Sequence, residues 1–343
     1  MSLQVRSVRL GPVSFRARPR TWLVAALAWG IALVGAVAVL FSGSVNMTPE
    51  QFWAALAGVG ERADMLLLWE FRMPRAVAGL VVGACLGTAG CLFQALSRNA
   101  LGSPEIIGLT GGAALGAVAS VIVFRSFGWG TAVGAIIGCL GAALLTWVLS
   151  PRGFGGGNRL ILIGLGVASL IQPVTVLLLT RADSDSATSA RLWLTGTLNA
   201  RNWSHAAVGA VLFAVILPFA LLISRHLDAA APGEDLAAGL GVSRRFTQWT
   251  ATGVGVALTA AAVAVAGPIS FIALAGPHVA RRLLKGPTAP AGVAAGTGAA
   301  LLVAADLVGA NLPGGLQLPV GVTAGLLGGA YLLLLLNGQE GKK

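Results

Sequence analysis

The sequence predicts an all-α polytopic membrane protein with ten transmembrane helices. Hydrophobic residues make up 56% of the 343 positions and charged residues only 10%, a balance that a soluble domain of this length does not need. The 48 glycines agree with this class, because glycine is commoner in membrane helices than in soluble ones. The apolar residues also gather in ten separate runs.

Each run can form a helix that crosses much of a hydrocarbon core of roughly 30 Å. The runs cover residues 22–41, 76–96, 106–124, 129–149, 159–180, 205–224, 249–266, 268–283, 293–311 and 318–336. The run 268–283 is short and is interrupted by Pro277. The mixed segment 42–71 is a loop in which we expect a short surface helix near residues 52–56.

Glycines recur at four-residue spacing in three of these runs. This spacing puts small residues on one helix face, where a neighbouring helix can approach closely. The stripes consist of Gly79, Gly83 and Gly87 with Gly90 nearby, of Gly108, Gly112 and Gly116, and of Gly130, Gly134 and Gly138. Helix packing accounts for all of them.

The distribution of basic residues orients the chain. Residues 1–20 carry five arginines and no acid, and the run that follows is longer than the 7–15 residues of a signal-peptide core. We therefore expect a cytoplasmic basic segment 1–20, a transmembrane domain 21–336 and a cytoplasmic tail 337–343. This topology places sixteen of the 23 lysines and arginines on the inner side, in agreement with the positive-inside rule.

Ionisable residues are nearly absent from the runs, and Asp306 is the clear exception. A carboxylate in a membrane is a functional candidate, but an acid hydrogen-bonded across helices is the favoured interpretation here. A proton relay usually needs a chain of such groups, so the sequence argues against a proton-driven secondary transporter. The three cysteines Cys85, Cys91 and Cys139 lie inside apolar runs and are expected to be packing residues.

Several function classes lack their signature. No G-x-x-x-x-G-K-[ST] motif occurs, so the chain is not expected to bind ATP through a P-loop. No catalytic grouping marks a membrane-embedded enzyme, and no histidine spacing marks a metal site. The basic residues lie in short loops and not on one face, which argues against nucleic acid as a partner.

The largest inner loop spans residues 226–246. Acids at Glu234 and Asp235 could open a short helix, since the helix dipole favours negative charge there, and Gly239 and Gly241 would end it. The residues alone leave two interpretations equally open, which are a docking helix for a soluble partner and a plain connector.

Seven segments, taken together and in order, resemble the FecCD family of ABC-transporter permeases, which are membrane subunits of type II importers. They are residues 72–75, 83–94, 98–104, 233–245, 267–274, 277–282 and 318–323. Within the family, GPISFIALAGPHVARR and QLPVGV are most similar to ferric-enterobactin permease subunits. The resemblance implies ten transmembrane helices, with an inverted repeat of helices 2–5 and 7–10.

The resemblance also implies the partners. They are a second FecCD-type permease subunit, expected to be a homologue in a heterodimer, two ATPase subunits, an extracytoplasmic siderophore-binding protein and the lipid bilayer. The chain itself is expected to bind no cofactor and to be no enzyme, with ATP on the ATPase subunits. The expected location is the bacterial cytoplasmic (inner) membrane, with both termini in the cytoplasm.

Residue roles follow from the same resemblance. Arg72 and Arg75 match arginines that meet glutamates of the binding protein, and guanidinium groups suit carboxylates. Asn99 and Leu101 match residues that narrow a cytoplasmic gate. The positions that match the ATPase-coupling helix are Glu234, Asp235, Leu236, Ala237, Ala238, Gly239, Leu240 and Gly241.

The expected function is import of a ferric siderophore, with an enterobactin-like catecholate favoured. The alternative within the family is a vitamin B12 or haem permease. An ion-coupled secondary transporter is the alternative from another class, and the scarcity of membrane acids opposes it.

Overall fold

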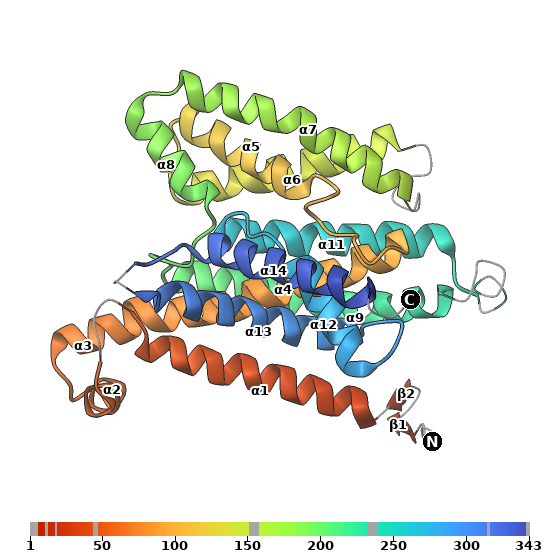
Figure 1. Ribbon diagram of the computed structural model, residues 1–343, viewed down its shortest axis with the longest axis horizontal. Coiled ribbons are helices and arrows are strands. Elements are labelled where there is room, and N and C mark those ends of the chain that lie inside the picture. Colours follow the sequence, from red (N-terminus) through yellow and green to blue (C-terminus); the bar gives the residue numbers. More distant parts are fainter. Residues whose placement is uncertain are drawn as a thin grey trace.

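The computed structural model describes residues 6–10, 13–17, 19–43, 47–150, 158–231, 237, 239, 241–313 and 316–340. The helical elements of this part are α1 (Pro19–Phe41), α2 (Pro49–Leu56), α3 (Arg62–Leu66), the π-helix η1 (Leu67–Arg72), α4 (Met73–Ser97), α5 (Leu109–Ile122), α6 (Trp129–Leu149), α7 (Asn158–Arg181), α8 (Ser184–Leu194), α9 (Trp203–Ala230), α11 (Arg244–Ala266), α12 (Ile272–Leu284), α13 (Ala291–Ala310) and α14 (Val320–Glu340) (Figure 1). Near the N-terminus, β1 (Arg6–Leu10) and β2 (Val13–Ala17) pair as an antiparallel hairpin.

The helices confirm the predicted fold class. Within the described residues, seven helices are long and apolar enough to cross a membrane, namely α1, α4 with its preceding turns, α6, α7, α9, α11 and α13. Two further apolar helices, α5 and α14, are shorter, and α12 has 13 residues. These ten helices match the ten apolar runs in order, and seven of them have the length and hydropathy of a membrane span.

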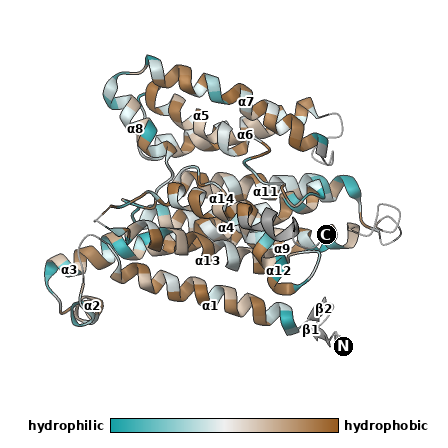
Figure 2. Cartoon of the chain, viewed as in Figure 1, coloured by the Kyte–Doolittle hydropathy of each residue, from teal (hydrophilic) through white to brown (hydrophobic). Residues whose placement is uncertain are grey.

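Helix α4 lies at the centre of the bundle. It packs against α13, α11, α12, α9 and α1 (Figure 1), and 83% of its most apolar window is buried, compared with 22% for α9 and 28% for α7. Brown, hydrophobic residues run along the outer helices α1 and α7 (Figure 2), and many of their apolar side chains are exposed, among them Leu27 and Leu170. Apolar side chains can face lipid, and a helix can do so without unsatisfied backbone groups because its backbone hydrogen bonds are made internally.

Close backbone approach explains the glycine stripe of α4. A Cβ atom at Gly83 would lie 2.6 Å from the carbonyl oxygen of Gly298 in α13, and one at Gly90 would overlap the carbonyl of Ala273 in α12. A side chain of any size would therefore force neighbouring helices apart. The predicted packing role of this stripe is confirmed.

Glycines also bring α5 and α6 into close backbone contact. Cβ atoms at Gly112 and Gly116 would overlap the backbone of Gly138 and Gly134 respectively. The two stripes predicted in the third and fourth runs are thus one helix–helix contact viewed from its two sides.

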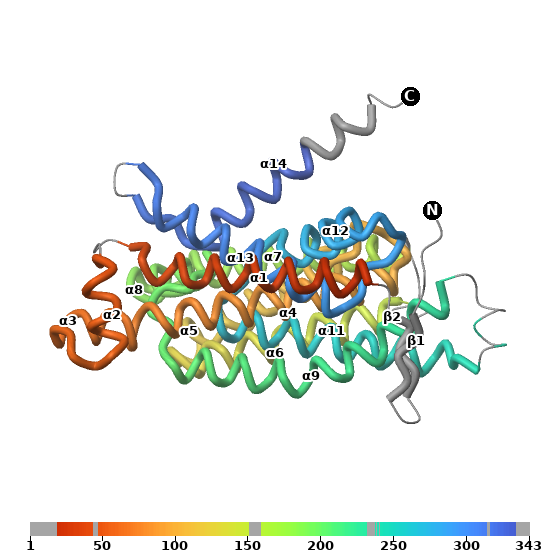
Figure 3. Tube along the Cα trace, turned by 90° about the horizontal axis from the view of Figure 1, so that it is seen from below, coloured from red at the N-terminus to blue at the C-terminus, as the bar shows by residue number. Residues whose placement is uncertain are grey.

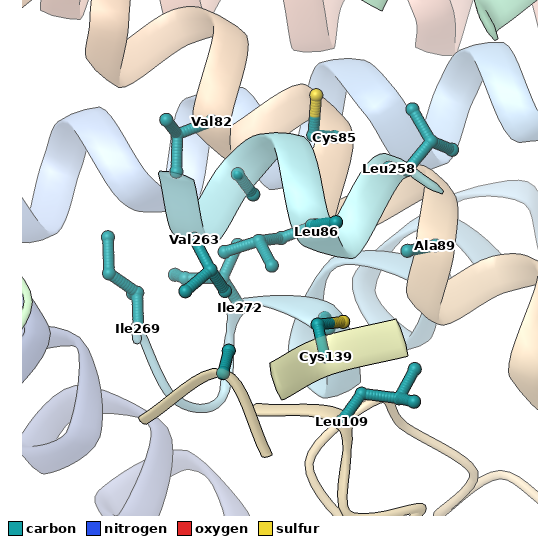
Figure 4. Close-up of a cluster of buried hydrophobic side chains, with 14 of the residues drawn as sticks. Val82, Cys85, Leu86, Ala89, Leu109, Cys139, Leu258, Val263, Ile269 and Ile272 are labelled. Atoms are coloured by element: carbon teal, nitrogen blue, oxygen red, sulfur yellow. The ribbon is translucent and has the colours of Figure 1, made fainter. Parts of the chain in front are cut away.

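The core of the bundle is apolar and contains the cysteines. Figure 4 shows Cys85 and Cys139 among Leu86, Val263 and Ile272, which come from α4, α6, α11 and α12 and belong to one buried cluster. All three cysteines are free and buried. Cys85 and Cys139 therefore serve as small packing residues, as the sequence predicted.

Two further helices lie outside the spans. Helix α2 occurs where a short helix was expected, and it begins with a capping box in which the Thr48 and Gln51 side chains each accept a hydrogen bond from the other residue's backbone N–H. Helix α8 was not predicted. Asp183 caps it by accepting a hydrogen bond from Ser186 N at 3.1 Å, which also holds the pKa of this carboxyl below its usual range.

Two helix ends also differ from prediction. Helix α9 continues to Ala230, beyond the predicted end at residue 224, because Leu227 still packs against the core. With α11 beginning at Arg244, the connection between these helices is shorter than the predicted loop 226–246. Helix α14 leaves the bundle at an angle (Figure 3) and exposes apolar side chains, among them Leu326 at 63%.

Candidate functional site

The start of α4 carries an ion pair. Arg75 Nε donates to Asp306 Oδ2 at 2.9 Å and its NH2 group donates to Oδ1 at 2.8 Å, so the contact is bidentate. The two side chains are 18% and 4% exposed. The pair joins α4 to α13, and it confirms that Asp306 is bonded across helices.

Arg72 lies one turn earlier, where η1 passes into α4. It is only 5% exposed, and its guanidinium donates to the carbonyl oxygen of Leu40 at the end of α1. The structure therefore places both predicted docking arginines side by side, each engaged within the chain. Their docking role stays a prediction.

The opposite end of α4 is a tight turn. Arg98 ends the helix in the left-handed conformation, with φ 49°. Asn99 Oδ1 then accepts from Leu101 N at 2.8 Å, and Asn99 O accepts from Gly102 N at 3.0 Å. Leu101 is 53% exposed, so the two predicted gate residues form one turn with an apolar tip.

The predicted coupling segment is partly described. Glu234, Asp235, Leu236, Ala238 and Leu240 lie outside the described residues. Ala237 is 5% exposed, and Gly241 turns the chain with φ 75°. A cavity of about 900 Å³ is bordered by both Asn99 and Ala237, so the gate turn and the coupling segment face one space.

A polar contact that sequence reasoning missed lies beside this cavity. Gln94 is 4% exposed, donates from Nε2 to Leu274 O at 3.2 Å and accepts from Arg281 through Oε1. It ties α4 to α12. In the sequence, the available signal for this contact was the amide side chain of Gln94 within the apolar run 76–96.

The two connections that follow α4 and α11 meet each other. Glu105, from the connection between α4 and α5, accepts a hydrogen bond from Phe271 N at 2.8 Å. Phe271 precedes α12 and has φ 69°. The carboxylate thus satisfies a backbone N–H at the start of a helix, where negative charge is favoured.

Comparison with known proteins identifies the family. The model of the FecCD transport family matches residues 31–337, which is most of the chain. The chain belongs to the FecCD transport family. The permease protein FepG of the ferric enterobactin transport system of Escherichia coli (strain K12) is 40% identical over 306 residues, covering 89% of this chain and 92% of FepG.

Other FecCD relatives cover the chain equally well. The probable siderophore permease protein YfhA of Bacillus subtilis (strain 168) is 33% identical and covers 93% of this chain, with 96% of YfhA covered in return. A solved metal-chelate type ABC transporter in an inward-facing conformation matches with a TM-score of 0.81 at 25% identity, over 92% of this chain and 99% of that one. The chain is thus a multi-pass membrane permease subunit, a class of transport subunits that are not enzymes.

Replacing Glu105 tests the contact between the two connections of this FecCD chain. We expect Glu105→Ala to lower the free energy of unfolding by about 1–2 kcal/mol, because the N–H of Phe271 would lose its acceptor at a partly buried position. Glu105→Gln keeps an acceptor oxygen and should lose less. Thermal unfolding of the purified chain measures both, with the exposed Glu61→Ala as control. Equal stability of Glu105→Ala and the parent chain would contradict the role of this bond.

Proposed function

We propose that this chain is the permease subunit of an ATP-driven ABC importer for a ferric siderophore of the enterobactin-like catecholate class. The observation that carries the proposal is the 40% identity to the ferric enterobactin permease protein FepG along nearly the whole of both chains. The relatives named for achromobactin, iron(3+)-hydroxamate and Fe(3+) dicitrate are 32%, 32% and 35% identical. The enterobactin, hydroxamate and dicitrate names all include iron, whereas the chelator varies, so the higher identity to FepG favours a catecholate.

Reconstituted transport tests this proposal. The chain, its second permease subunit and the ATPase would be placed in liposomes loaded with ATP and Mg²⁺, with the binding protein outside. Radioactive iron would be offered as the enterobactin, hydroxamate and citrate complexes, and cobalamin and haem would be offered in parallel. We expect uptake of the ferric catecholate to exceed that of every other ligand by tenfold or more.

Two controls separate the alternatives. Liposomes loaded with ADP should take up nothing, because the chain is proposed to bind no nucleotide and to depend on its ATPase partner. Uptake that continues without ATP, driven by an ion gradient, would instead favour a secondary transporter. Uptake of cobalamin or haem in preference to every ferric siderophore would contradict the proposal that the substrate is a ferric siderophore.

The start of α4 is proposed to face the extracytoplasmic binding protein. Arg72 and Arg75 supply guanidinium groups there. Arg75 is already paired with Asp306, and this limits how it can bind a partner. A carboxylate of the binding protein would have to share Arg75 with Asp306 or take its place. Docking would then act directly on the contact between α4 and α13.

The other end of the bundle is proposed to face the cytoplasm, with both termini there and the protein in the bacterial inner membrane. Residues 234–241 would dock on one of two ATPase subunits, and Asn99 and Leu101 would narrow the exit. The shared cavity supports this assignment, because motion of the segment at Ala237 would reach the Asn99 turn directly. The exposed apolar side chains of α14 support pairing with a second permease subunit.

A further inference from the structure

A groove follows the pair of helices α5 and α6. Its volume is about 720 Å³, and on α6 its lining runs from Gly130 to Leu145. On α5 the lining runs from Gly112 to Ser120. At 1.5 Å per residue the α6 wall is about 22 Å long, so the space is a long, narrow groove between two helices and not a compact pocket.

The lining of this groove is apolar. Among the described lining residues only Ser120 and Ser126 have polar side chains, and the Ser120 hydroxyl already donates to Gly130 O at 2.9 Å. Water in the groove would find few partners, whereas a bound water needs several hydrogen bonds. An empty groove would lose the dispersion contacts of its lining atoms. An apolar occupant suits this lining best.

The groove lies on an outer surface of the membrane-spanning bundle. Helix α6 is long and apolar enough to cross a membrane, and Val133 and Ile137 of its groove wall are 53% and 64% exposed. Figure 1 shows α5, α6 and α7 together at one edge of the bundle, with α11 beneath them. Helix α14, which is proposed to meet the second permease subunit, rises from the edge opposite α6 and α9 (Figure 3). The hydrocarbon of the bilayer is therefore the apolar medium that this groove meets.

The size of the groove suits one hydrocarbon chain. Its volume and length correspond to a mean cross-section of about 33 Å². An α-helix with its side chains, roughly 10–12 Å in diameter, has a cross-section of about 80 Å² or more, so a helix of a partner protein is too thick to enter. One leaflet of the hydrocarbon core is about 15 Å deep. The groove is longer than this, so an acyl chain can lie in it along its whole length.

One end of the groove carries a positive charge. Arg125 stands between Phe124 and Ser126, which both line the groove, and it is exposed in the connection between α5 and α6. Within the described part of the chain Arg125 forms no ion pair, and Asp183 attracts it only at longer range. Trp129 at the start of α6 is 40% exposed, and tryptophan is enriched where membrane proteins meet the headgroup region. A guanidinium group at this level suits a lipid phosphate.

We propose that this groove between α5 and α6 binds one acyl chain of a phospholipid, whose phosphate lies against Arg125. The chain enters beside Phe124 and runs over Gly134 and Gly138. Because no side chain at these glycines fills the groove, the bound acyl chain supplies the missing contacts and stabilises the α5–α6 pair. The lipid belongs to the leaflet at the end of the bundle where α6 begins.

Photo-labelling of the full-length chain tests the proposal. The chain is reconstituted into nanodiscs that contain a trace of phosphatidylglycerol with a diazirine group in one acyl chain, and mass spectrometry locates the labelled peptides after illumination. Any lipid-facing helix receives some label, so the exposed face of α9, with Val211 and Val215, gives the background. We expect the α5 and α6 peptides to carry at least about threefold more label than α9, because a bound chain stays beside them longer than a freely exchanging one.

Two substitutions fill the groove, and a third is their matched control. Gly141→Leu and Ala119→Leu each place a larger side chain in the groove, from α6 and from α5, and should lower the labelling of both helices to the α9 background. Gly166→Leu in α7 is the control, because Gly166 does not line the groove and, like Gly141, has nothing within 4 Å of an added Cβ. It should leave the label within about twofold of the parent chain. Similar unfolding temperatures establish that the three variants fold.

Arg125→Gln tests the phosphate contact. It should lower labelling by the phospholipid about twofold to fivefold, the range of an exposed ion pair. Labelling by a diacylglycerol with the same diazirine chain should not change, because that lipid has no phosphate. Equal labelling of Arg125→Gln and the parent chain by the phospholipid would contradict this contact.

Two results would overturn the proposal as a whole. One is labelling of α6 that equals that of α9, or that both groove-filling variants leave unchanged, because the lipid would then be held no more firmly than on any exposed helix. The other is loss of the label when the second permease subunit is bound, because a protein partner would then cover the groove.

Discussion

Asp306→Ala is expected to lower the free energy of unfolding by about 3 kcal/mol, at the lower end of the cost of breaking a buried ion pair, because this pair is partly buried. Arg75 is only 18% exposed and directs both of its bonded nitrogens to this carboxylate. Without Asp306 the guanidinium loses its bidentate acceptor between α4 and α13, where it is only partly solvated. Arg75→Ala should lower the free energy of unfolding by a similar amount, since it leaves the Asp306 carboxylate, which is 4% exposed, without its cationic partner.

A double-mutant cycle separates this pair from simple packing. Arg75→Leu and Asp306→Leu together remove both charges, so the double variant should be more stable than either single leucine variant. Denaturant titration in mixed micelles gives the four free energies. The exposed Arg62→Leu serves as control and should change stability by less than about 0.5 kcal/mol. A double variant as unstable as the sum of its single variants would show that the charges are not coupled.

Local sequence signals were sufficient for the spans. Each transmembrane helix is an apolar run flanked by polar residues, and its residues are contiguous, so length and hydropathy find it. The same holds for the glycine stripes, whose spacing is set by helix geometry. Helix α8 was not predicted because its composition is mixed. Asp183, three residues before Ser186, was nevertheless an available signal for the helix cap.

The contacts at the site could not be derived in this way. Arg75 and Asp306 are 231 positions apart, and Glu105 and Phe271 are 166 apart, so no periodicity relates them. The sequence identified Asp306 as a bonded membrane acid but could not name its partner. The cavity beside Asn99 was equally hidden, because it depends on where four helix ends meet in space.

Gly90→Ala should destabilise the bundle by about 3 kcal/mol, at the upper end of the cost of overpacking. The added methyl group would overlap the carbonyl of Ala273. This carbonyl belongs to the backbone of α12 and the methyl carbon is fixed to the backbone of α4, so neither can rotate away. Helices α4 and α12 would have to separate, and the contacts of Gln94 with Leu274 and Arg281 would loosen with them. Alanine gains about 0.5–1 kcal/mol over glycine in a helix, which offsets only a part of this cost.

Gly141→Ala is the matched control, because Gly141 also lies inside a membrane helix but a Cβ there meets nothing within 4 Å. It should be neutral or stabilising by up to about 1 kcal/mol. The difference between the two variants, measured in one denaturant titration, isolates helix contact from helix propensity. If both glycines tolerated alanine equally, α4 and α12 would not be in the close contact that the structure shows at Gly90.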